Sequence, residues 1–265
     1  MDVYPPRSDS DRFPAVMLLH GGAFIRGDKR STERIGRILA RVGYVAFAVN
    51  YRLIPEDLTI AEGIDRYWDA VQDVEAAASY IWAHAGRFGV DVRRVGAFGI
   101  SAGGTFATML GWRGVEWRRE RTSMAAVVAW SPALDMYETM RDPSLAARPS
   151  APDIPGRDDG TLELHRDALV AASPLTYVGP SSAPTLLVNA RDDLVPLDTA
   201  RLAASRLEEA GVPTQLLVRP RGHAMGYAGR TIVPSLRFLD RYVRDRGQGD
   251  ARDPRPPAPS GAASP

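Results

Sequence analysis

Three features of the sequence predict an α/β fold with a doubly wound, mostly parallel sheet. Short apolar runs rich in β-branched residues alternate along the chain with segments of helical periodicity. The runs are apolar at consecutive positions, which is typical of strands that are buried on both faces. The chain has 265 residues, of which 45% are hydrophobic, and this suits one domain with a large core.

The strands are predicted from these apolar runs. They lie at 15–19 (AVMLL), 45–49 (VAFAV), 95–100 (VGAFGI), 125–130 (AAVVAW), 185–190 (TLLVNA) and 214–218 (TQLLV). Because helical segments lie between them, we expect right-handed crossover connections.

The clearest helix is predicted between Asp65 and His84, where apolar side chains recur at helical spacing until Gly86 ends the pattern. Similar patterns predict helices at 31–42, 101–112, 198–210 and 231–245. The alternation of these helices with the strands supports the doubly wound arrangement.

Two regions depart from the alternation. Residues 131–180 form a long, proline-rich excursion with one helix predicted near 160–171. Stretches of that length between strands are usually functional or disordered. Residues 246–265 lack apolar side chains that could anchor them, so we expect a disordered tail after a domain spanning residues 1–245.

The composition and charge of the chain indicate which classes of binding partner to expect. The net charge is +1 and no block of like charges occurs, so nothing indicates a nucleic acid or a membrane surface as partner. The chain has no cysteine and its four histidines are scattered, so we expect no metal. The N-terminus has no apolar signal region and no run is long enough to span a bilayer, which predicts a cytoplasmic protein with a small-molecule partner.

A nucleophile is indicated at Ser101. Gly99-Ile100-Ser101-Ala102-Gly103 matches the G-x-S-x-G pattern, with a predicted strand before it and a predicted helix after it. A serine hydroxyl needs to project from the backbone, next to a base and to donors for the oxyanion, and the glycines permit that crowding. The alternative is a serine that only caps the following helix.

A second glycine-rich segment, His20-Gly21-Gly22-Ala23-Phe24, directly follows the first predicted strand. Backbone amides in such a segment can approach a developing negative charge closely, and the amide after the nucleophile would supply another donor. The alternative is an ordinary turn between a strand and a helix.

The base and its acid are expected after the nucleophile in the order Ser, Asp or Glu, His. His223 follows the last predicted strand in a loop with nearby glycines, whereas His165 lies in the proline-rich excursion. Asp192 and Asp193 both follow the strand at 185–190, and only one of them can orient the imidazole. The alternative for His223 is a surface histidine.

Together these segments resemble the serine esterase and lipase branch of the α/β-hydrolase superfamily. The resemblance is to small carboxylesterases near the hormone-sensitive-lipase and the feruloyl- or acetyl-esterase-like groups, and it covers residues 2–245. Its motifs are HGGAFIRGDK (20–29), NYRLIPE (50–56), GISAGG (99–104) and NARDDLVP (189–196).

This resemblance implies a role for each site residue. Ser101 would be the nucleophile and His223 the general base. The spacing to Val195 selects Asp192 as the acid. The oxyanion donors would be the amides of Gly22, Ala23 and Ala102, although many relatives have glycine where this chain has Ala23.

The activity implied is hydrolysis of carboxylic esters through an acyl-enzyme, without a cofactor. The N-terminal cap helices of some relatives are absent, which leaves residues 131–180 as the expected lid and favours short acyl or acetyl esters. An arylformamidase-like hydrolase of amides or formamides is an alternative, since the same triad serves both bonds. A non-catalytic ligand-binding member of the fold is another, although binding alone would not require all three side chains.

Overall fold

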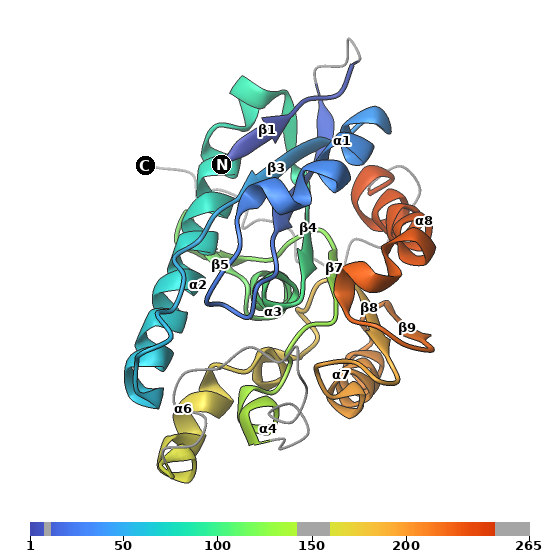
Figure 1. The fold of residues 1–265 in the computed structure, drawn as a ribbon. Coiled ribbons are helices and arrows are strands. Elements are labelled where there is room, and N and C mark those ends of the chain that lie inside the picture. Colours follow the sequence, from blue (N-terminus) through green and yellow to red (C-terminus); the bar gives the residue numbers. More distant parts are fainter. Residues whose placement is uncertain (8–11, 142–159, 247–265) are drawn as a thin grey trace, which may run out of the picture.

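The computed structural model describes residues 1–7, 12–141 and 160–246. Its centre is a seven-stranded sheet with the order β1-β3-β2-β4-β7-β8-β9, in which only β1 runs antiparallel to its neighbour (Figure 1). The strands of this sheet are β1 (Asp2–Tyr4), β2 (Phe13–Leu19), β3 (Val45–Val49), β4 (Val90–Ile100), β7 (Val127–Trp130), β8 (Thr185–Ala190) and β9 (Thr214–Arg219). The predicted fold class is therefore confirmed.

Helices cover both faces of the sheet. The longer ones are α1 (Glu33–Arg41), α2 (Ile60–Ala83), α3 (Ala102–Thr108), α7 (Leu197–Glu209) and α8 (Ala228–Leu239). Short 3₁₀-helical or π-helical segments extend or join them: η1 (Lys29–Thr32), η2 (Ala85–Phe88), η3 (Met109–Arg113), η6 (Ala224–Tyr227) and η7 (Asp240–Arg244). Helices α2, α3 and α7 pack on one face, and α1 and α8 pack on the other.

The two faces explain why the strands are apolar throughout. In β2, Met17 and Leu19 join the core under α2 and α3, whereas Val16 and Leu18 join the core under α1 and α8. Each strand therefore buries successive side chains in opposite directions.

Helix α2 begins five residues before the predicted start because a capping box lies there. The side chain of Thr59 accepts the N–H of Glu62, and the Glu62 carboxylate accepts the N–H of Thr59 at 3.0 Å. These two hydrogen bonds satisfy backbone donors that the first turn of a helix leaves open.

The sequence did not reveal a small hairpin that follows α3. Strands β5 (Val115–Trp117) and β6 (Glu120–Thr122) pair antiparallel, and the turn between them places Arg118 and Arg119 at φ of 52° and 65°. Such turns usually carry Asn-Gly or Asp-Gly, so a pair of arginines offers no turn signal.

Described parts of the 131–180 excursion contain short helices. These are α4 (Met136–Arg141), η4 (Leu162–His165), α6 (Arg166–Ala171) and η5 (Pro174–Tyr177). The helix predicted near 160–171 is present as η4 followed by α6, whereas α4 was not predicted. Residues 142–159, which belong to the expected lid, lie outside the described residues. The tail 247–265, for which disorder was predicted, also lies outside them. In the described part of the chain, no helix has the length and apolar character needed to cross a membrane.

Candidate active site

Ser101 stands on a sharp turn between β4 and α3, with φ of 53° and ψ of −123°. The two flanking glycines are required by close backbone contacts. A Cβ on Gly99 would lie 2.0 Å from the carbonyl oxygen of Gly103, and a Cβ on Gly103 would lie 2.2 Å from the carbonyl oxygen of Leu19. The serine is thus held in a left-handed conformation at the carboxyl end of the sheet, as a nucleophile elbow requires.

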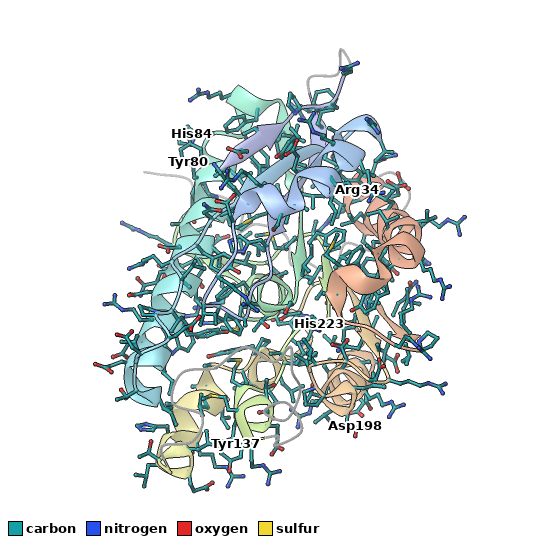
Figure 2. All side chains as sticks on the ribbon, in the orientation of Figure 1. Arg34, Tyr80, His84, Tyr137, Asp198 and His223 are labelled. Atoms are coloured by element: carbon teal, nitrogen blue, oxygen red, sulfur yellow. The ribbon has the colours of Figure 1, made fainter. Side chains whose placement is uncertain are left out.

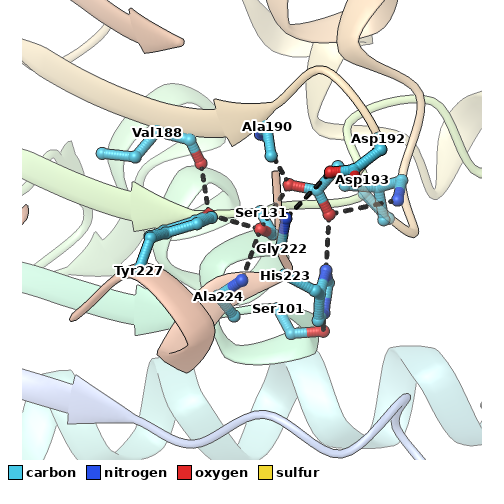
Figure 3. Close-up of polar contacts among 12 residues, drawn as sticks. Ser101, Ser131, Val188, Ala190, Asp192, Asp193, Gly222, His223, Ala224 and Tyr227 are labelled. Atoms are coloured by element: carbon cyan, nitrogen blue, oxygen red, sulfur yellow. Dashed lines mark hydrogen bonds and ion pairs between the residues drawn. The ribbon is translucent and has the colours of Figure 1, made fainter. Parts of the chain in front are cut away.

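His223 lies beside this serine although 122 residues separate them. Its Nε2 is 2.8 Å from Oγ of Ser101 (Figure 3). The histidine comes from the loop between β9 and η6, at the same edge of the sheet as the elbow. Figure 2 shows His223 near the centre of the molecule, with Tyr137 and Asp198 toward the end that carries α4 and α7.

The acid that contacts His223 is Asp193, so the expectation for Asp192 was wrong. Oδ1 of Asp193 lies 2.5 Å from Nδ1 of His223, and the side chain of Asp193 is completely buried. Asp192 instead accepts the backbone N–H of Gly222 at 2.8 Å. Asp193 therefore contacts the imidazole, while Asp192 binds the backbone of the loop that carries the histidine (Figure 3).

The turn after β8 explains this change of register. The N–H of Ala190 donates to Oδ2 of Asp193 at 2.9 Å, and the N–H of Val195 lies 3.4 Å from Oδ1. Because the loop folds back over its own carboxylate, the second aspartate points inward and the first lies outside. A spacing measured along the chain to Val195 does not reveal such a turn.

Ser131 also belongs to this group, although it was not predicted from the sequence. Its Oγ donates to Oδ2 of Asp193 at 2.7 Å and accepts the N–H of Ala224 at 2.9 Å. One signal was available: Ser131 directly follows the strand at 125–130, and polar residues that end parallel strands meet at one edge of the sheet.

The glycine-rich segment after β2 packs directly on the elbow. A Cβ on Gly21 would lie 2.9 Å from the carbonyl oxygen of Ile100 and 3.1 Å from Cβ of Ser101. The next residues, Gly22 and Ala23, have φ of 134° and 53°, which turn the segment back at this point. The N–H of Ala102 belongs to the first turn of α3, where the helix supplies no acceptor.

His20 stabilises the glycine-rich segment through contacts with Gly21 and Tyr51, rather than with Ser101 or His223. Its Nδ1 donates to the carbonyl oxygen of Gly21 at 2.9 Å, and its ring stacks on Tyr51 with centroids 4.3 Å apart. The Tyr51 hydroxyl donates to the carbonyl oxygen of His20 at 2.7 Å. Burial lowers the pKa of His20, so its imidazole is neutral at pH 7.

Aromatic side chains pack together beside the glycine-rich segment. Phe24 makes edge contacts with Phe106 at 5.4 Å and with Tyr67 at 5.7 Å between ring centroids. Tyr67 and Phe106 stack at 5.5 Å. Rings so closely packed form a rigid apolar wall next to the glycine-rich segment.

The arrangement links a hydroxyl, an imidazole and a carboxylate in one chain of hydrogen bonds. Because Nδ1 of His223 donates to Asp193, Nε2 carries the lone pair that faces the hydroxyl of Ser101. This tautomer can take a proton from the serine, and the carboxylate can stabilise the imidazolium that results.

The chain is similar in sequence to known esterases. The family model BD-FAE matches residues 1–207. The chain is 30% identical to Esterase LipU of Mycobacterium tuberculosis over 251 residues, which cover 87% of this chain and 77% of that protein. It is 30% identical to the acetyl esterase of Salmonella choleraesuis over 133 residues, which cover 48% of this chain and 37% of that protein.

A solved structure has the same fold. Esterase 2 of Thermogutta terrifontis superposes with a TM-score of 0.71 at 22% identity, covering 92% of this chain and 89% of that one. The family match spans most of the chain, including the elbow and the acid loop. The chain belongs to the BD-FAE family, and it is a carboxylic ester hydrolase with the α/β-hydrolase fold.

Proposed function

We propose that this protein hydrolyses esters of short acyl chains, acetyl esters among them, with Ser101, His223 and Asp193 as its catalytic triad. The observation that carries the proposal is the hydrogen-bonded sequence from Ser101 Oγ to His223 Nε2 and from His223 Nδ1 to Asp193 Oδ1. A strained serine, a base within reach and a buried acid are the parts that acyl transfer to serine requires.

In the first step, Oγ of Ser101 attacks the ester carbonyl while Nε2 of His223 takes the hydroxyl proton. The tetrahedral intermediate carries a negative oxygen. The amides of Gly22, Ala23 and Ala102 are the proposed donors to it, because the first two follow the residue that packs on Ser101 and the third opens α3.

The intermediate then collapses. His223 returns its proton to the departing alkoxide, the alcohol leaves, and the acyl group stays on Ser101. Water attacks this acyl-enzyme with His223 again as base, which releases the carboxylic acid and restores the serine. Asp193 stays ionised throughout and stabilises the imidazolium in both steps.

The preference for short acyl chains is supported by the aromatic wall. Phe24, Tyr67 and Phe106 fill the volume beside the glycine-rich segment with rings that contact one another. A long acyl chain needs an extended apolar cavity instead. The similarity to an acetyl esterase points the same way.

The test is a series of p-nitrophenyl esters from acetate to palmitate, together with an aryl formamide. We expect kcat/KM to be highest for acetate or butyrate and to fall with chain length, and we expect Ser101→Ala to lose this activity. A rate that rises toward palmitate would contradict the substrate class. Hydrolysis of the formamide without hydrolysis of any ester would contradict the proposed reaction.

A further inference from the structure

The carboxylate of Asp193 is held on the side opposite His223 by a buried hydroxyl. Oδ1 of Asp193 faces the imidazole, and Oδ2 accepts from Oγ of Ser131 at 2.7 Å. Ser131 is completely buried. A hydrogen bond to an ionised acceptor is stronger than one between neutral groups, and no water competes for it here.

The same hydroxyl reaches the loop that carries the base. Oγ of Ser131 accepts the N–H of Ala224, the residue directly after His223, at 2.9 Å. Ser131 follows β7, Asp193 follows β8 and Ala224 follows β9, so one oxygen joins the ends of three neighbouring strands (Figure 3). This side chain thereby connects acid and base in addition to their direct contact.

The backbone at this junction is strained. Ser131 has φ of 49° and Ala224 has φ of 46°, and neither residue is a glycine. A left-handed conformation is unfavourable for a residue with a Cβ. A glycine at position 131 would avoid that cost but would lack the hydroxyl, so the use of serine here indicates that the side chain has a role.

Tyr227 determines where the proton of Ser131 goes. The phenol oxygen lies 2.9 Å from the carbonyl oxygen of Val188 and is also hydrogen-bonded to Oγ of Ser131. Burial raises the pKa of Tyr227, so the phenol stays protonated. Because each hydroxyl has one proton, the Ser131 hydroxyl can donate to the carboxylate of Asp193 only when the phenol is the donor to Oγ of Ser131.

We propose that Ser131 is a positioning residue of the active site, which acts through Asp193. This inference rests on the proposed function. The hydroxyl keeps its proton throughout the reaction and, together with the N–H of Ala190 on the same oxygen, prevents the carboxylate from rotating when His223 becomes charged. It also takes negative charge from Oδ2 and so moderates the basicity that Asp193 confers on the imidazole.

The first measurement compares Ser131→Ala with Ser131→Gly on p-nitrophenyl acetate. Both variants lose the hydroxyl, but only glycine relieves the backbone. We expect kcat to fall about 10- to 100-fold in both, as for the loss of one hydrogen bond to a charged group, with KM changed less than about threefold. Recovery of kcat in Ser131→Gly would show that the backbone matters and would overturn the proposal.

Ser235→Ala is the matched control. The Ser235 hydroxyl is also completely buried, accepts from Nε1 of Trp130 at 3.0 Å and donates to the carbonyl oxygen of Thr231 at 2.8 Å. Its loss removes the same number of atoms from the interior away from Asp193. We expect this variant to keep kcat within about twofold of wild type, and an equal loss in the control would contradict a specific role for Ser131.

Two further readouts separate positioning from general damage. The groups that titrate or carry charge around the imidazole are Asp193, Asp192 and Tyr227, with Arg219 near the phenol. Without the Ser131 donor, Asp193 stabilises the imidazolium more strongly, so the acidic limb of the pH profile of kcat/KM should move to higher pH in Ser131→Ala.

The second readout is a double mutant. In an Asp193→Asn background, Ser131→Ala should lower kcat by less than about threefold. An unmoved limb or a fully additive loss would overturn the proposal.

The rate at which a fluorophosphonate labels Ser101 keeps this test independent of the substrate. If wild type labels at Ser101 but hydrolyses no ester, the proposed reaction is wrong while the labelling rate still reports on Ser131. We expect slower labelling in Ser131→Ala and Ser131→Gly than in Ser235→Ala. Equal labelling rates in all three would count against a role of Ser131 at the nucleophile.

Discussion

The carboxylate of Asp193 lies 2.5 Å from Nδ1 of His223, and the two residues come from loops that end the neighbouring strands β8 and β9. Asp192, the residue before it, accepts the N–H of Gly222, the residue before the histidine. The two loops therefore contact each other directly at the imidazole and at the backbone. Because the two aspartates have different partners, we expect their substitutions to have different effects on activity.

Asp193→Asn should lower kcat by a factor on the order of 10⁴, because an amide neither selects the required tautomer of His223 nor stabilises its charged form. Asp192→Asn should lower kcat by less than about tenfold, since asparagine keeps a side-chain oxygen that can accept the N–H of Gly222. The measurement is kcat on p-nitrophenyl acetate for both variants, with folding matched by circular dichroism. Greater damage from Asp192→Asn would contradict the assignment of the acid.

Ser101→Gly should be more stable than Ser101→Ala by about 1 kcal/mol, because glycine adopts a φ of 53° without steric strain. For a chain of this size that difference corresponds to about 2–4 °C in Tm. Neither variant should be labelled by a fluorophosphonate or turn over an ester. Thermal unfolding and intact-mass analysis check the two parts separately, and equal Tm values would mean that the elbow stores no strain.

Gly103→Ala should destabilise the fold by at least about 2 kcal/mol, because its Cβ would lie 2.2 Å from the carbonyl oxygen of Leu19 and 2.4 Å from that of His20. The displaced atoms belong to the glycine-rich segment, so kcat should fall as well. Gly229→Ala in α8 is the matched control. It meets nothing within 4 Å and should stabilise the protein by about 1 kcal/mol, as alanine does in a helix. Denaturant unfolding of the pair tests both signs.

The stability of the fold should depend on pH through His20. Burial lowers its pKa below the usual 6.5, so the folded state binds the proton less readily than the unfolded state does. The contribution of His20 to stability is therefore complete above pH 6.5 and is lost as the pH falls through the lowered folded value. Because carboxylates also titrate, the measured quantity is the difference in the free energy of unfolding between wild type and His20→Gln.

The difference in the free energy of unfolding between wild type and His20→Gln should shrink as the pH falls from 7.5 to 5. A His20→Gln difference that grows toward low pH would show that the protonated form is favoured by folding.

The order of the elements could be predicted from the sequence because it depends on local chemistry. The strands at 45–49 and 185–190 were placed at their observed bounds, since continuous apolar runs bury both faces. Ser101 and His223 could also be predicted, because glycines around a serine and a histidine after the last strand are local signals. The hairpin at 115–122 could not, since its turn uses arginines in a left-handed conformation.

The sequence by itself determined the fold class, the family and the two residues that face each other at the elbow. Only the tertiary structure decided which aspartate meets His223 and that Ser131 supports it. The first depends on a turn after β8, in which the Asp193 carboxylate folds back onto the N–H of Ala190, and the second on a contact that joins Ser131 to Asp193 across 62 residues of sequence. Spacing along the chain does not reveal the turn, and the contact of Ser131 with Asp193 is formed only when β7 and β8 lie side by side.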